Sequence, residues 1–147
     1  MSVRTGRRLG LLACSMWLMG CAASGAESSS RADPVITRVA DPRIPYPLAK
    51  VEGTLSLEQG CLMINGEVAF WPAGTTWDAE NRSVRFGGDF QGAAPVSVDA
   101  RFTGGGGLWP AGHDLRWMLD KDAEAAIRDC LARTGATCAV LLYPDRP

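Results

Sequence analysis

The single histidine, His113, stands beside Asp114 in the run Gly112-His113-Asp114. A carboxylate next to an imidazole can hold it as a general base. No sequence typical of a nucleophile stands nearby, so we interpret His113 as an exposed loop side chain. A metal site would need ligands from scattered strands, because no known ligand spacing occurs. We therefore expect no catalytic residue, no metal, no cofactor and no enzyme activity.

Tryptophans are the other residues whose chemistry could serve a function, in this case the recognition of a ligand or partner. Trp77, Trp109 and Trp117 fall in expected loops or at strand ends rather than in alternating strand interiors. An indole offers a large rigid area and one donor, so it can stack on a sugar ring or anchor a partner protein. The three rings are therefore candidates for a binding surface. The alternative is that they plug the open ends of a small barrel.

The N-terminus has the order of a secretion signal. Arg4, Arg7 and Arg8 precede the apolar run Leu9–Met19, which ends at Gly20. A membrane-spanning helix needs about 20 apolar residues, and this run is shorter. Residues 1–20 are therefore expected to form a signal peptide that is removed from the mature protein.

The residues Leu18-Met19-Gly20-Cys21 resemble the bacterial lipobox, although Met19 is larger than usual. The resemblance implies a diacylglycerol on Cys21 and durable anchoring by several acyl chains. Ala22 and Ala23 follow where an aspartate often retains lipoproteins in the inner membrane. We expect a cell-envelope protein, on the outer membrane facing the periplasm if the host is Gram-negative. The alternative is an ordinary secretory signal cleaved nearby.

Residues 21–48 are rich in Ser, Ala, Pro and charge, and the prolines exclude a continuous helix. We expect a lipidated cysteine followed by a flexible tether. The apolar run Val35–Val39 could instead dock on the domain. Residues 49–147 then form a single small β-rich domain, because about 100 residues support one modest core.

The charge balance argues against nucleic acid as a partner. After Cys21 the chain carries 12 basic and 16 acidic residues, a net charge of about −4. The basic residues are not clustered along one stretch.

The domain starts with alternating or apolar runs that are typical of strands. Val51–Leu57, Cys61–Ile64 and Glu67–Trp71 form a predicted meander, with Asn65-Gly66 suited to a tight hairpin turn. Ser83–Phe86 predicts a short fourth strand. Val96–Phe102 alternates most cleanly, with Val96, Val98, Ala100 and Phe102 on one face.

Gly104–Gly107 predicts a turn, since the run lacks the Lys-Ser/Thr ending of a phosphate-binding loop. Asp120–Arg133 has helical spacing, with acids first and arginines last as the helix dipole favours, and Gly135 predicts its end. Cys138–Tyr143 predicts a final strand. The fold class is mainly β with one C-terminal helix, as a small OB-like barrel or a curled antiparallel sheet.

A second resemblance rests on Val51-x-Gly53-x-Leu55-x-Leu57-x-x-Gly60-Cys61-Leu62, on Phe70-Trp71-Pro72-x-Gly74 and on a cysteine before an apolar C-terminal strand. The pattern looks like a group of small secreted or lipid-anchored bacterial β-domains. It implies a fold and an address but no activity.

The cysteines are odd in number, because Cys61, Cys130 and Cys138 remain once Cys14 and Cys21 are assigned to the signal and the lipid. The resemblance favours a disulfide from Cys61 to a cysteine of the C-terminal part. Closing so long a loop is worth about 4.5 kcal/mol in the chain-entropy model. We predict one disulfide, from Cys61 to Cys130 or to Cys138.

Together these patterns favour a non-catalytic, membrane-anchored envelope module that binds a protein or a glycan. The alternative is a structural or stress-related lipoprotein without a dedicated ligand. An enzyme is disfavoured because no nucleophile, base and metal ligands converge in the sequence.

Overall fold

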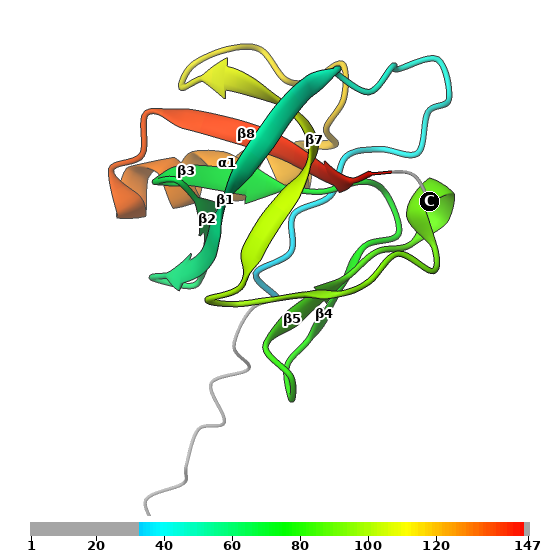
Figure 1. Cartoon of the computed structure of the whole chain (residues 1–147). Coiled ribbons are helices and arrows are strands. Elements are labelled where there is room, and N and C mark those ends of the chain that lie inside the picture. The colour runs from blue at the N-terminus through cyan, green and yellow to red at the C-terminus, as the bar shows by residue number, and fades with distance from the viewer. Residues whose placement is uncertain (1–32, 146–147) are drawn as a thin grey trace, which may run out of the picture.

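Five strands close into a barrel in the computed structural model, which describes residues 33–145 (Figure 1). They are β1 (Ala49–Glu58), β2 (Cys61–Ile64), β3 (Glu67–Phe70), β7 (Arg101–Pro110) and β8 (Cys138–Pro144). Their order around the barrel is β1-β2-β3-β8-β7, and β1 pairs with β7 to close it. The predicted mainly β fold with one C-terminal helix and a small OB-like barrel is confirmed. The sheet is mixed rather than antiparallel, because β3 and β8 run parallel.

The local turns follow the sequence. Asn65 and Gly66 both have positive φ, as the tight β2–β3 turn requires. Helix α1 (Lys121–Thr134) begins after Asp120, whose side chain accepts a hydrogen bond from the Ala123 backbone N–H. It ends at Gly135 in the left-handed conformation. The predicted helix is therefore confirmed to within one residue at each end.

The barrel wall separates two apolar clusters, because side chains alternate between the faces of each strand. The inner cluster fills the barrel and contains Leu55, Leu62, Ile64, Ala69, Trp71, Val84, Phe86, Phe90, Phe102, Val140 and Leu142. The outer cluster lies between the wall and its covering layer and contains Ile36, Cys61, Met63, Val68, Phe70, Leu115, Met118, Leu119, Ile127, Cys130, Ala139 and Leu141. Helix α1 covers the wall at β3 and β8 (Figure 1).

The second part of the covering layer is the segment 35–46. The Trp71 N–H donates to the Ile36 carbonyl at 2.8 Å, and the Arg38 N–H donates to the Trp71 carbonyl at 2.8 Å. Ile36 and Arg38 are buried. The expectation of a tether up to residue 48 is wrong for this segment, because its apolar side chains pack on the barrel. Docking of Val35–Val39 was the correct alternative.

Two predictions between residues 96 and 107 are wrong. Val96–Phe102 is not one strand, because it contains β6 (Val96–Ser97), a turn with Asp99 at φ 68° and the start of β7. The predicted turn at Gly104–Gly107 lies inside β7. An added Cβ at Gly105 would overlap the Tyr143 ring. Glycine is therefore used here for close approach, not for a turn.

A small sheet covers one end of the inner cluster. It consists of β4 (Thr76–Asp78), β5 (Ser83–Arg85) and β6, paired in that order. The 3-10 turn η1 (Gly88–Phe90) lies between β5 and β6 in the chain. In Figure 1 this sheet lies at the end of the molecule opposite to the loop between β7 and α1. Within residues 33–145 no helix is long and apolar enough to cross a membrane.

Candidate binding surface

The structure brings together two of the three candidate tryptophans. The rings of Trp109 and Trp117 lie 6.4 Å apart with their planes at 62°. Trp117 is 49 % exposed, whereas Trp109 is half-buried. Trp77 lies elsewhere, in β4, where it pairs with Val84 and packs on the inner cluster. Trp109 and Trp117 therefore form one aromatic surface, which we call the Trp pair.

Two elements hold the Trp pair. Trp109 lies on β7 opposite Ala139, and its ring packs on Phe70 with centroids 5.7 Å apart. Trp117 lies in the loop between β7 and α1, where Met118 on its C-terminal side is buried. The Met118 N–H donates to the Leu115 carbonyl at 2.9 Å. The tight turn buries Leu115 and Met118 and leaves the indole of Trp117 facing solvent.

A cavity of about 510 Å³ lies between α1 and the loop that carries Trp117. We call it the α1 groove. Its apolar lining comes from Pro110, Leu115, Ile127, Leu131 and Ala139, and its charged lining from Asp114, Arg116, Lys121, Glu124 and Arg128. Trp109 and Trp117 are not in its lining, although Pro110 and Arg116, their neighbours in the chain, are.

The cations of the α1 groove differ in how they are used. Arg116 folds back on Asp114, with Nε and Nη2 donating to the two carboxylate oxygens at 2.9 and 2.7 Å. This contact holds the pKa of Asp114 well below its usual range and raises the pKa of Arg116. Arg128 reaches Glu124 only at 4.0 Å, and Lys121 makes no ion pair within the described residues. Lys121 is therefore the one cation of the α1 groove without an ion pair among the described residues.

Sequence reasoning missed Lys121 and Arg128. The signal was present, because residues 121, 124, 128 and 131 follow a 3-4-3 spacing that places them on one face of a helix. His113 also lines this groove and is exposed. Its backbone N–H donates to the Pro110 carbonyl at 3.0 Å. Among residues 33–145, no three His, Cys, Asp or Glu side chains gather as a metal ion would require.

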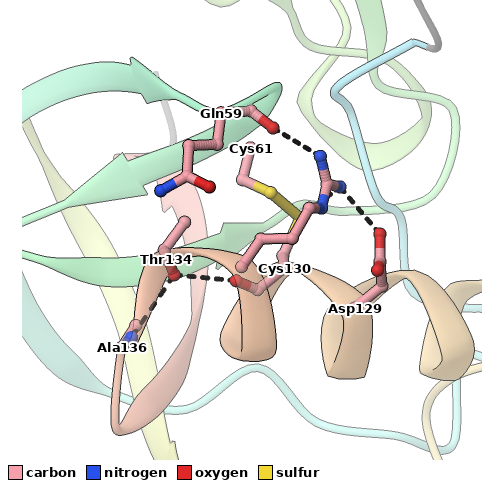
Figure 2. Close-up of a disulfide and its surroundings, with 7 residues drawn as sticks. Gln59, Cys61, Asp129, Cys130, Thr134 and Ala136 are labelled. Carbon is pink, nitrogen blue, oxygen red and sulfur yellow. Dashed lines mark hydrogen bonds and ion pairs between the residues drawn. A yellow bond between two sulfur atoms is a disulfide. The ribbon is translucent and has the colours of Figure 1, made fainter.

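A disulfide joins Cys61 of β2 to Cys130 of α1, with Cα atoms 5.8 Å apart (Figure 2). The predicted pairing of Cys61 with Cys130 or Cys138 thus takes the first form, and Cys138 is free. Arg133 lies over the bond and donates to the Gln59 carbonyl, which joins the end of α1 to the β1–β2 turn. The disulfide fixes the helix that forms one wall of the α1 groove.

A second cavity of about 680 Å³ lies against the segment 35–46, with Tyr46, Phe90 and Tyr143 in its lining. Arg38 also lines it but is only 4 % exposed. Its Nη2 donates to the Ile44 and Asp41 carbonyls at 2.8 and 3.2 Å. Its guanidinium lies 4.3 Å from the centre of the Tyr46 ring. Nε and Nη2 of this buried cation are therefore used inside the fold, whereas its buried Nη1 has no hydrogen-bond partner among the described residues.

No protein-family model matches the chain, and no curated protein or solved structure matches it either. The expected signal peptide and the expected lipidation of Cys21 lie outside the described residues.

Proposed function

We propose that the protein is a membrane-anchored envelope lipoprotein whose domain is a non-catalytic module that binds another envelope component, a protein or a glycan. The observation that carries the binding role is the exposure of Trp117 at 49 % in ring contact with Trp109. A large aromatic ring left in solvent in contact with a second ring is typical of binding surfaces. The anchor on Cys21 and the periplasmic address rest on the lipobox-like sequence Leu18–Cys21.

The two halves of the proposal are tested separately. Mass spectrometry of the processed protein should find a diacylglyceryl group on Cys21 as the first residue. Cys21→Ser should release the protein from the membrane fraction. A mature N-terminus at another residue would contradict the anchor while leaving the binding role open.

The binding role is tested by a photoreactive residue at position 117 in living cells. We expect one dominant adduct, identified by mass spectrometry. The matched control is position 80, because Glu80 is exposed in the turn between β4 and β5. These two strands lie at the end of the molecule opposite to the loop between β7 and α1 (Figure 1). Equal adduct patterns from positions 117 and 80 would contradict a dedicated surface.

The second candidate is a structural lipoprotein without a ligand, and the contact of Trp109 with Phe70 favours it. In that case both indoles only cover the outer cluster. The substitution Trp117→Ala distinguishes the two functions, with a photoreactive residue at position 116 as the probe. If Trp117 binds a partner, the substitution abolishes the adduct and leaves the melting temperature unchanged. As a plug, the same substitution lowers the melting temperature and has no adduct to remove.

A further inference from the structure

We propose that the protein forms a two-fold symmetric dimer through the first half of β1, with Lys50 of each copy opposite Glu52 of the other. The surface is a strand edge that the barrel leaves open. It includes neither the Trp pair nor any residue of the α1 groove. The partner that fits it is a second copy of this chain.

The open edge follows from the stagger of the barrel strands. β1 pairs with β7 over Ala49–Thr54, but it pairs with β2 only over Leu55–Glu58. Within the described residues, the β2 side of the first half of β1 therefore has no neighbouring strand. A strand edge of this kind presents unpaired backbone N–H and C=O groups, which can pair with another chain.

The direction of the backbone groups identifies the residues that face the open edge. The Leu55 N–H donates to the Ala100 carbonyl at 3.0 Å, immediately before β7, so the backbone groups of Leu55 face the β7 side. Because this direction alternates along a strand, those of Lys50 and Glu52 face the open edge. The Asn65 side chain agrees with this direction, since its Nδ2 donates to the Glu52 carbonyl at 2.7 Å from the β2–β3 turn.

The backbone groups at this edge remain accessible. Lys50 and Glu52 are both exposed, and between residues 33 and 145 neither makes a backbone hydrogen bond to a loop or turn. Asn65 uses one lone pair of the Glu52 carbonyl, and a carbonyl oxygen has two. The edge therefore offers an N–H and a carbonyl from each of the two residues.

Charge selects the second copy as the occupant and fixes its register. Lys50 and Glu52 lie on the same face of β1, where they form an ion pair. If Lys50 faced Lys50 of the second copy, or Glu52 faced Glu52, like charges would lie directly opposite and destabilise the pairing. Centring the two strands on Val51 instead places Lys50 opposite Glu52 at both ends. The edge is therefore complementary to itself, as a two-fold interface requires.

The charge pairing is tested by sedimentation velocity of the full processed protein in detergent at micromolar concentration. We expect a dimer. Lys50→Glu places a carboxylate opposite Glu52, and Glu52→Lys places an ammonium opposite Lys50, so each variant alone should weaken the dimer at least about tenfold. An equimolar mixture of the two variants should form a dimer again, because every facing pair then has opposite charges. Mixing restores no ion pair within a single copy, so recovery reports contact between copies.

The control for the charge reversal is Arg85→Glu. It makes the same change in charge as Lys50→Glu, at an exposed arginine of β5 outside the edge. It should leave the dimer unchanged.

The register is tested by cysteine crosslinking in isolated membranes, with Cys138→Ser in every variant. Oxidation of mixed Lys50→Cys and Glu52→Cys proteins with copper phenanthroline should join the two copies. Directly opposite residues of a hydrogen-bonded antiparallel pair have Cα atoms about 5.5 Å apart, which a disulfide can span. Either variant alone should crosslink less than the mixture, and Glu80→Cys, in the exposed turn between β4 and β5, gives the background.

A monomeric wild-type protein, a mixture of the charge variants that stays monomeric, or crosslinking no faster than that of Glu80→Cys would each overturn the inference. Loss of the dimer in Arg85→Glu would overturn it as well, since net charge would then explain the effect. The proposed function fails separately, because it depends on the adduct from position 117 in cells.

Discussion

Helix α1 and the segment 35–46 cover the same wall of the barrel, but they are held to it in different ways. The helix is held covalently through Cys61–Cys130. The segment is held by backbone hydrogen bonds of Ile36 and Arg38 to Trp71, and the Arg38 side chain braces it by donating to carbonyls of its own loop. The helix therefore keeps charged side chains for the solvent, whereas the segment uses its buried charge to fold.

The comparison is close because the segment 35–46 and the loop before α1 contain the same surface motif. In Asp41-Pro42-Arg43 and in Asp114-Leu115-Arg116 the arginine donates through its backbone N–H and its side chain to the aspartate two residues before it. In both, this contact lowers the pKa of the aspartate. The regions also differ in their remaining cations, which are Arg38 in one and Lys121 and Arg128 in the other.

The largest effect should come from the disulfide. Replacing Cys61 and Cys130 by serine should lower the free energy of unfolding by about 4 kcal/mol, because the bond closes a loop with a sequence separation of 69. Urea unfolding measures this loss. Cys138→Ser is the control and should cost less than about 1 kcal/mol, since Cys138 is free and half-buried. Equal losses in both variants would mean that the bond does not hold α1.

Arg38 in the segment 35–46 should contribute less to the free energy of unfolding than the disulfide does. Arg38→Met removes hydrogen bonds to three carbonyls and should cost about 2–3 kcal/mol in urea unfolding. Arg38→Lys keeps the charge but not the planar fork, so it should recover little. Arg43→Met, at a side chain that is 88 % exposed, should change stability by less than about 0.5 kcal/mol. Recovery by lysine would assign the effect to charge alone and would contradict the role given to the fork.

The contact between β7 and the segment 35–46 should contribute still less to the free energy of unfolding. Gly105→Ala forces the Tyr143 ring to move, and that ring packs on Tyr46 of the segment with centroids 4.9 Å apart. We expect a loss of about 1–2 kcal/mol in thermal or urea unfolding. Thr103→Ala, at an exposed residue of the same strand, is the control. A neutral Gly105→Ala would show that the glycine run is not required for close approach.

Local patterns predicted most of the barrel and the helix. The runs around Asn65-Gly66 and the capping residues Asp120 and Gly135 determine nearby structure by themselves, so periodicity and turn chemistry located them. Gly104–Gly107 was misread because its reason lies far away in the chain. The ring of Tyr143 lies over Gly105, and no local pattern records that contact.

The candidate site was predicted only in its aromatic half. Trp109 and Trp117 were identified by type and position, and the structure places them together. Lys121 and Arg128 face the groove only because α1 packs on the barrel beside the loop at Leu115. The choice of Cys130 over Cys138 likewise depends on how the helix docks, which its sequence spacing leaves open.

The smallest loss of stability should come from the two Asp–Arg pairs, Asp41–Arg43 and Asp114–Arg116, and should be equal for both. Asp41→Asn and Asp114→Asn should each lower the melting temperature slightly at pH 7, because the arginine of each pair is exposed and surface pairs contribute little. Arginine lowers the folded-state pKa of each aspartate below that of the unfolded chain. The stabilisation is therefore present above about pH 4 and is lost as the pH falls through the lowered folded-state pKa. Melting curves from pH 7 to pH 2 should show the wild-type and variant temperatures converging at the acid end. Effects that differ between the two variants would show that the surrounding region, and not the shared motif, determines the strength of the pair.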